Sequence, residues 1–270
     1  MKIMFLGTAS GAGKTTVSAM YCRYLARNGV SVAPFKASNL SLRSKEVAGG
    51  RIGIGQALQA EAAGIEPTAD MNPVLLEPVG KGSIRMYLNG SPHSEMDDKN
   101  YMEAEYILEE ACLAFDRLSE KYEAIVCEGS GSPAEINMKN RDIANKGMIR
   151  SRNIPAVLVG DIERGGVFAA LYGTWKLMPD DIRKCLKGFV INRFRGDVSI
   201  LDSGIRKIEE MTGMKFLGLL PHMKLELPEE DSPSCDDGTV ADITESLDEM
   251  IGKAEESGFD FDGLNRIAKS

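Results

Sequence analysis

The sequence has few of the residues that bind transition metals or form disulfide frameworks. It contains two histidines and five cysteines, and no two cysteines form a CxxC pair. A structural zinc site and a disulfide-stapled fold are therefore not expected, and scattered reduced thiols fit a cytosolic chain. A Cys-His nucleophilic pair is the alternative, although single cysteines in apolar stretches usually fill a core.

Long apolar runs and dense basic runs are also missing. No apolar stretch reaches the ~18 residues that a transmembrane helix requires, so no membrane association is expected. The N-terminus has no signal-peptide pattern, which makes the cytoplasm the expected location. Nucleic acid is not an expected partner, because no basic run and no interleaving of aromatic with basic residues occurs.

The net charge of -8 is unevenly distributed along the chain. Residues 226–270 contain 14 acidic and 3 basic residues, whereas residues 1–225 contain 26 acidic and 29 basic ones. A slightly basic body suits a polyanionic small molecule, although solvated lysines would explain the balance equally well. The stretch LPEEDSPSCDDG, residues 227–238, is acidic and contains proline, which is typical of a linker.

Short apolar segments alternate with helical patterns along the body. The candidate strands are KIMFLG (2–7), SVAPF (31–35), IRMYLN (84–89), AIVCEG (124–129), AVLVGD (156–161), GFVINRF (188–194) and FLGLLP (216–221). Helices are predicted over 14–28, 54–63 and 102–120. All the strands except 84–89, which alternates as an exposed strand would, are continuous apolar runs. This pattern predicts an α/β fold with a mostly parallel, twisted sheet and helices on both faces.

Two parts of the chain are distinguished by composition. Residues 1–228 form the predicted body, and residues 229–270 form an acidic linker and tail. An amphipathic helix is predicted over 240–256. This helix could dock on the body, bind a partner or stay mobile.

The stretch GTASGAGKTT, residues 7–16, lies between the first strand and the first helix. A glycine-rich turn there directs free backbone N–H groups and the positive end of the helix dipole toward an anion. Gly13, Lys14 and Thr15 fit the end of the phosphate loop GxxxxGK[ST], although Thr8 replaces its first glycine. The prediction is a nucleoside triphosphate with Mg²⁺, bound by Thr8, Gly11, Ala12, Gly13, Lys14, Thr15 and Thr16.

Two polar residues end later strands, where ligands bind parallel sheets. Glu128 could hold Mg²⁺ directly or through water, or it could simply cap its strand in solvent. Asn192 could read an adenine edge, since an amide both donates and accepts, or it could stabilise a turn.

Eight motifs taken together resemble the N-terminal ATP-dependent domain of cobyric acid synthase, a dethiobiotin-synthetase-like P-loop family. In order across residues 1–232 they are GTASGAGKTT, VAPFKASN, QALQAEAAGIEPTADMNPVLLEP, EGSGSPAEIN, RDIAN, DIERGGVFA, GFVINRFRGD and LPEEDS. The phosphate loop of this family also has an extra residue before GKT, which matches the displaced glycine.

The resemblance implies an ATP-dependent ligase of cobalamin biosynthesis. Such an enzyme activates the side-chain carboxylates of a corrinoid, adenosylcobyrinic acid a,c-diamide, as acyl phosphates that ammonia converts to amides. Lys14 and Thr15 match the phosphate-binding lysine and the magnesium hydroxyl. Lys36 matches a catalytic lysine between the γ-phosphate and the incoming carboxylate, although it could be a surface lysine. Glu128 matches the metal-binding acid, and Asn192 matches the adenine reader.

Further motif residues are expected on the substrate side by the same resemblance. Asp142 is assigned to the catalytic group because it could order a substrate loop or tune a local charge, and a helix-surface ion pair is the alternative. The substrate-binding candidates are Asn39, Gln56, Ser130, Glu135, Asn137 and Arg164.

The chain departs from the family after LPEEDS, where the family continues into a glutaminase domain. Only about 40 residues follow, with a single cysteine, Cys235, and no histidine. We therefore expect that this chain does not hydrolyse glutamine. Its ammonia would be either free or supplied by a separate glutaminase subunit, and the acidic tail could be a docking peptide for that subunit. The alternative is a P-loop ATPase that acts on another carboxylate or switches a partner. The family resemblance also allows a homodimer.

Overall fold

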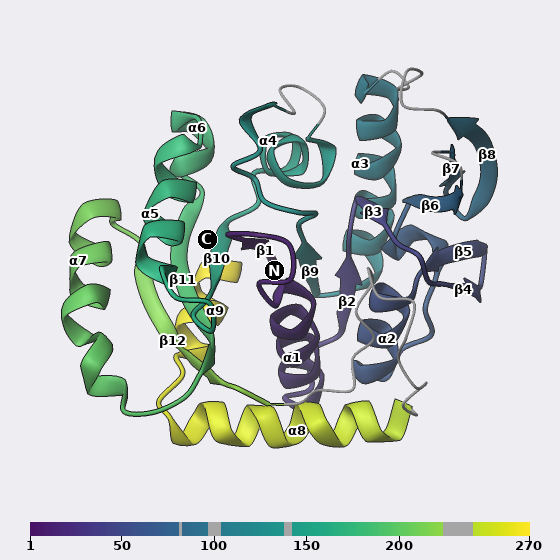
Figure 1. The fold of residues 1–270 in the computed structure, drawn as a ribbon. Helices are drawn as coiled ribbons and strands as arrows, with labels where there is room; N and C mark the ends of the chain where they lie inside the picture. The colour runs from purple at the N-terminus through teal and green to yellow at the C-terminus, as the bar shows by residue number, and fades with distance from the viewer. Residues whose placement is uncertain (81–82, 97–103, 138–141, 224–239) are drawn as a thin grey trace.

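The computed structural model describes residues 1–80, 83–96, 104–137, 142–223 and 240–270 (Figure 1). Its centre is a six-stranded sheet in the order β12-β11-β10-β1-β9-β2, in which every neighbouring pair is parallel. The strands are β1 (Lys2–Gly7), β2 (Val32–Phe35), β9 (Ala124–Glu128), β10 (Ala156–Asp161), β11 (Leu186–Phe194) and β12 (Lys215–Pro221). They coincide with the six continuous apolar segments, so the predicted parallel α/β fold is confirmed.

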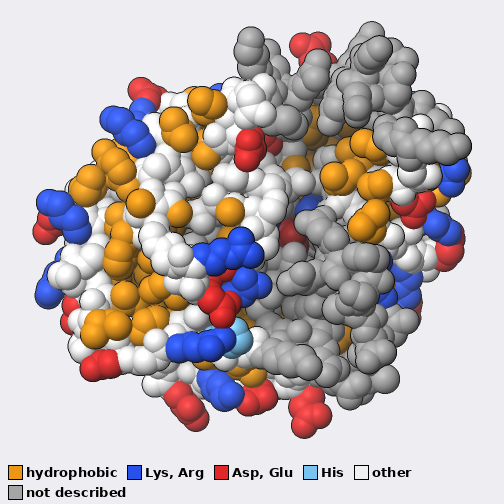
Figure 2. Space-filling view, in the orientation of Figure 1, with side chains coloured by type: hydrophobic (Ala, Val, Ile, Leu, Met, Phe, Trp, Pro, Cys, Tyr) orange, Lys and Arg blue, Asp and Glu red, His pale blue; other side chains and the backbone are white. Residues whose placement is uncertain are grey.

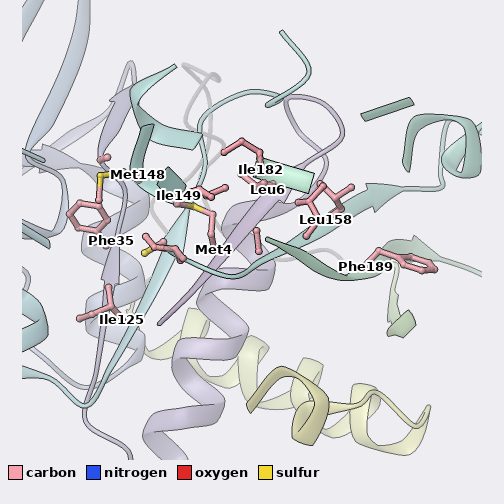
Figure 3. Packing of buried hydrophobic residues seen from close by; sticks show 14 of the residues in the cluster. Met4, Leu6, Phe35, Ile125, Met148, Ile149, Leu158, Ile182 and Phe189 are labelled. Carbon is pink, nitrogen blue, oxygen red and sulfur yellow. The ribbon is translucent and has the colours of Figure 1, made fainter. Parts of the chain in front are cut away.

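Helices cover both faces of this sheet, because side chains in each strand alternate between two cores. Ile3 and Phe5 of β1 pack in one core, and Met4 and Leu6 pack in the other, part of which Figure 3 shows. The first core is covered by α1 (Lys14–Arg27), α2 (Ile54–Ala62), α8 (Val240–Glu256) and α9 (Phe261–Ala268). The second is covered by α3 (Ala104–Lys121), α4 (Met148–Arg152), α5 (Val167–Leu177), α6 (Asp180–Arg183) and α7 (Asp202–Thr212).

A second, smaller sheet has the order β3-β6-β7-β8 and lies beside α3 (Figure 1). Its strands are β3 (Ser38–Leu40), β6 (Val74–Gly80), β7 (Ser83–Leu88) and β8 (Ser91–Met96), and β4 (Ser44–Val47) pairs with β5 (Gly50–Gly53) nearby. The short helical turns are η1 (Ala69–Met71), η3 (Ile143–Gly147) and η4 (Val198–Leu201). The expectation that 84–89 is an exposed strand is wrong, because β7 lies between two strands and buries Met86, Tyr87 and Leu88.

The C-terminal helices pack on the body. Helix α8 spans the predicted residues 240–256 and runs across the end of α1 in Figure 1. Its apolar side chains, Ile243, Leu247, Met250 and Ile251, are buried in the same core as α1. The Arg23 guanidinium of α1 donates to both carboxylate oxygens of Asp248, each at 2.8 Å. The predicted boundary at 228 and the linker lie outside the described residues, so the two-part division stays a prediction.

No helix in the described part of the chain is long and apolar enough to cross a membrane.

Candidate active site

The phosphate loop connects the end of β1 to the start of α1. Gly11 and Gly13 have φ values of 69° and 97°, a left-handed conformation that glycine adopts without steric cost. The Thr8 N–H donates to the Val159 carbonyl at 3.0 Å, which fixes the start of the loop to β10. The Lys14 side chain is buried and folds back over the loop, where its ammonium donates to the Ala9 carbonyl at 3.3 Å.

The glycine displaced from the usual loop pattern has a structural reason. Gly7 lies beneath the Lys14 side chain, and a Cβ there would come within 2.9 Å of Lys14 Nζ and 2.8 Å of the Ala9 carbonyl oxygen. A Cβ this close would force the Ala9 carbonyl or the Lys14 side chain to shift. The glycine at the last residue of β1 therefore lets Lys14 fold back over the loop, and Thr8 occupies the position where the usual motif has its first glycine.

Asn192 lies at the end of β11 against the phosphate loop. Its amide nitrogen donates to the Ala12 carbonyl at 3.1 Å, and its amide oxygen accepts the Arg193 N–H at 2.9 Å. A side chain at Gly13 would collide with this amide. Asn192 thus braces the loop, and its role as an adenine reader stays a prediction.

Four side chains donate hydrogen bonds to the carboxylate of Glu128 at the end of β9. The Thr15 hydroxyl and the Lys36 ammonium each donate to Oε1 at 2.9 Å. The Gln59 and Gln56 amides donate to Oε2 at 2.7 Å and 3.4 Å. The loop, the end of β2 and helix α2 therefore converge on one carboxylate.

The Glu128 carboxylate is held in its charged form although its side chain is 1% exposed. Burial raises the pKa of this carboxyl, but the charge and hydrogen bond of Lys36, with the Lys14 charge and the Gln59 hydrogen bond, outweigh burial and leave the pKa below its usual value. A buried carboxylate of this kind is a ready ligand for a cation.

The donor set at Glu128 fits Mg²⁺. This ion prefers oxygen ligands, uses one or two carboxylates, and keeps several waters and phosphate oxygens. Glu128 supplies the carboxylate, and the Thr15 hydroxyl, whose hydrogen is donated to Glu128, keeps its lone pairs available. Among the described residues, no three His, Cys, Asp or Glu side chains form a metal site by themselves. Phosphate and water would have to complete the coordination.

Two asparagines extend this polar cluster toward the small sheet. The Asn39 amide of β3 donates to Gln56 Oε1 at 3.1 Å, and Gln56 donates to Glu128, so Asn39 is connected to the carboxylate through Gln56. Asn72 accepts the Gly53 N–H at 3.0 Å and donates to the Lys36 carbonyl at 2.9 Å. These bonds tie the start of α2 to the end of β2, and therefore fix the position of Gln56 relative to Lys36.

The loop after β9 is held by the π-helical turn η3. The Asn145 side chain accepts the Ser130 N–H at 3.1 Å and donates to the Ser130 carbonyl at 2.8 Å. Asp142 caps the turn by accepting the Asn145 N–H at 3.0 Å, and it lies 3.2 Å from the buried Lys146 ammonium. Lys146 is buried and Asp142 is half-buried, and Asp142 supports the loop that contains Ser130 through its bond to Asn145. The alternative of a helix-surface ion pair involves the neighbouring Arg141, which lies outside the described residues. A catalytic role for Asp142 stays a prediction.

The remaining candidates lie nearer the surface. Glu135, Asn137 and Arg164 are exposed, and Thr16 is half-buried, so their predicted roles rest on the motifs alone. Basic and acidic side chains gather beside one another near the middle of the face drawn in Figure 2. At the carboxyl ends of β10 and β11, Arg193 pairs with Asp161 at 2.7 Å.

Sequence reasoning missed three buried amides that hold the site together: Gln59, Asn72 and Asn145. Gln59 had a usable signal, because it follows Gln56 by three residues in a mostly apolar helix and therefore shares its face. Asn72 and Asn145 lie inside the quoted motifs, but their partners are main-chain groups that only the fold brings near.

Comparison with known proteins agrees with this geometry. Residues 3–234 match the profile of the family described as the CobQ/CobB/MinD/ParA nucleotide binding domain. The chain belongs to this family.

Curated relatives of this family member confirm the resemblance drawn from the motifs. Proteins named "Probable cobyric acid synthase" are 50% identical in Methanoregula boonei, 48% identical in Methanosarcina barkeri and 47% identical in Archaeoglobus fulgidus. The matches cover 90%, 99% and 85% of this chain, and 51%, 56% and 50% of the relatives. The chain thus spans about half the length of the curated relatives it matches.

Solved structures support the fold alone. The MinC:MinD cell division protein complex of Aquifex aeolicus matches with a TM-score of 0.53 at 16% identity, over 100% of this chain and 96% of that chain. The signal recognition particle receptor FtsY of Elizabethkingia anophelis matches with a TM-score of 0.50 at 11% identity, over 91% of this chain and 64% of that one.

Proposed function

We propose that this chain catalyses the ATP-dependent amidation of corrinoid side-chain carboxylates in cobyric acid synthesis, with adenosylcobyrinic acid a,c-diamide as the substrate. The observation that carries the proposal is the convergence of Thr15, Lys36 and Glu128 beside the phosphate loop. The names of the curated relatives support the same activity and the corrinoid substrate. Ammonia is either free or delivered by a glutaminase.

The chemistry requires two anions to meet. An oxygen of the substrate carboxylate attacks the γ-phosphorus of ATP, ADP leaves, and the acyl phosphate formed has a good leaving group. Ammonia then attacks the acyl carbon, and phosphate leaves with the C–O electron pair. Positive charge has to offset the repulsion between carboxylate and triphosphate, so a site with two buried lysines suits this reaction.

Each charged group of the site has a role in this scheme. Lys14 binds the outer phosphates, and the N–H groups of the loop bind the remaining phosphate oxygens. The Thr15 hydroxyl and the Glu128 carboxylate would hold Mg²⁺, which would supply positive charge to neutralise the phosphates. Lys36, which pairs with Glu128 in this structure, lies at the end of β2, from where its ammonium can turn toward the γ-phosphate and the incoming carboxylate.

The corrinoid side of the site is the loop after β9. Ser130 is two residues beyond Glu128, and η3 fixes its backbone through Asn145. A rigid loop there orients the substrate carboxylate relative to the phosphate, which is the main way a protein accelerates phosphoryl transfer. Gln56 of α2 donates to Glu128, and Asn39 of β3 donates to Gln56, so these two residues are the other substrate-binding candidates of this site.

The test is ADP release from ATP, Mg²⁺ and ammonium, with and without cobyrinic acid a,c-diamide, followed by mass spectrometry of the corrinoid. We expect corrinoid-dependent ADP release and the mass decrease that accompanies replacement of a hydroxyl by an amino group. The Thr15→Ala variant should lose this release, and the matched Thr15→Ser variant, which keeps the hydroxyl, should retain most of it. Turnover that is indifferent to the corrinoid would contradict the proposal and favour another carboxylate or a partner switch.

A further inference from the structure

Helix α2 presents two buried glutamines to the metal-binding carboxylate. Gln56 and Gln59 are three residues apart, lie on one face of the helix, and are fully buried. A buried amide is destabilising unless its polar atoms are paired. Both side chains direct their NH₂ groups at Glu128 Oε2, and Gln59 is the closer, at 2.7 Å against 3.4 Å.

The two glutamines differ in what their amide oxygens contact. Gln56 Oε1 accepts a hydrogen bond from Asn39 at 3.1 Å, so the amide of Gln56 is satisfied within the protein. Gln59 Oε1 is buried, and within the described part of the chain no group donates to it. A buried acceptor without a donor is rare in folded proteins and indicates a missing water, ion or ligand.

Gln59 also contacts the second residue of the metal site. Its Nε2 lies 3.4 Å from the Thr15 carbonyl oxygen, in addition to its bond to Glu128. The Gln59 side chain therefore contacts both Glu128 and Thr15, the two residues proposed to supply oxygen ligands to Mg²⁺. Because Mg²⁺ keeps several of its waters when bound, a water of its inner shell is a suitable donor for the unpaired oxygen.

We propose that Gln59 is a positioning residue for the Mg²⁺ of the nucleotide site. Its NH₂ group orients the Glu128 carboxylate, and its Oε1 accepts a hydrogen bond from a water bound to the cation. The inference rests on the proposed nucleotide function and adds a residue to it. Outer-shell hydrogen bonds of this kind typically change metal affinity by about 10–100-fold.

The experiment measures binding of a non-hydrolysable ATP analogue to the full chain by calorimetry, with and without Mg²⁺. Gln59→Met keeps the length of the side chain and removes both its donor and its acceptor. We expect the Mg²⁺ concentration that gives half of the Mg²⁺-dependent gain in affinity to rise by about tenfold or more. Affinity for the analogue without Mg²⁺ should fall much less than this, since the loop N–H groups and Lys14 that bind phosphate keep their positions when Gln59 is replaced.

The matched control is Leu58→Ala, which removes buried apolar volume from the same helix at a residue that packs in the α1 core. It should lower thermal stability without moving the Mg²⁺ requirement. If Gln59→Met behaves like this control, with reduced stability and an unchanged Mg²⁺ requirement, the inference is overturned. Should Gln59→Met fail to fold, Gln59→Glu keeps the shape and adds a second carboxylate, and an unchanged Mg²⁺ requirement there would overturn it equally.

Failure of the proposed function would look different. If the original chain binds the analogue with Mg²⁺ but leaves the corrinoid unamidated, the substrate assignment fails while the Mg²⁺ measurements still decide the role of Gln59. If Mg²⁺ has no effect on binding by the original chain, the metal assignment fails, and the inference about Gln59 fails with it.

Discussion

Replacing Lys36 with methionine should destabilise the fold strongly, because it leaves the Glu128 carboxylate buried without its main counter-charge. The two groups are 2.9 Å apart, and their side chains are 4% and 1% exposed. Removing one partner of a buried ion pair costs about 3–5 kcal/mol. Three donors remain on Glu128, namely Thr15, Gln56 and Gln59, so we expect the lower end of that range, about 3 kcal/mol, and a Tm lower by roughly 6–10 °C.

This loss should depend on pH in a definite direction. In the original chain the pKa of Glu128 is lowered, so its pairing stabilises the fold above the unfolded-state pKa and is lost as pH falls through the folded-state pKa. Without Lys36, burial should dominate and raise the pKa of Glu128. The deficit of Lys36→Met should therefore be largest at neutral to alkaline pH, and should shrink on acidification as the buried carboxylate takes up a proton.

The measurement is denaturant unfolding followed by circular dichroism at a mildly alkaline and a mildly acidic pH. Lys253→Met is the control, because it removes an exposed pair with Glu249 that should contribute at most about 1 kcal/mol. Adding Glu128→Gln to Lys36→Met should recover at least about 1 kcal/mol, since the unpaired charge is gone. A deficit no larger than that of Lys253→Met, or one that does not change with pH, would refute the reasoning.

Three further substitutions test other parts of the structure. Gly7→Ala should weaken ATP binding by about tenfold or more, measured by calorimetry, because the new Cβ meets the Ala9 carbonyl and Lys14. Asn145→Ala should raise the KM for the corrinoid more than the KM for ATP, because Ser130 loses both of its bonds to η3; equal changes would argue against a substrate loop. Leu247→Ala should lower the free energy of unfolding by about 2–5 kcal/mol in denaturant titrations; a negligible change would mean that α8 does not pack on the body.

The parallel sheet was predictable because burial on both faces leaves a clear sequence pattern. Segments such as β1 and β10 are continuous apolar runs bounded by polar or glycine residues, and each was located correctly. The small sheet was largely missed for the opposite reason. Strand β8, with the sequence SPHSEM, contains a proline and several polar residues, so its composition does not predict a strand. Its strand conformation depends on its pairing with β7.

Residue type and motif singled out Lys14, Thr15 and Glu128, and the family resemblance added Lys36. The structure brings these four residues together, while their roles stay predictions. The contacts of a site residue were less predictable where its hydrogen-bond partner lies far away in the sequence. Asn192 was recognised as a site residue, but its bond to the Ala12 carbonyl joins positions 180 residues apart. No local pattern encodes such a contact, because it depends on how β11 is placed next to the phosphate loop.

The central position of β1 has a consequence for how the protein is made. Both of its neighbours, β9 and β10, come from much later in the chain. Lys2 of β1 pairs with Ile125 of β9, and Met4 of β1 pairs with Ala156 of β10. Pairings this distant fold slowly. At about 5–20 residues per second, on the order of ten seconds of translation separates the phosphate loop from the strands that brace it. During that interval the first strand remains an unpaired apolar edge, and ATP has no formed site from which to stabilise the nascent chain.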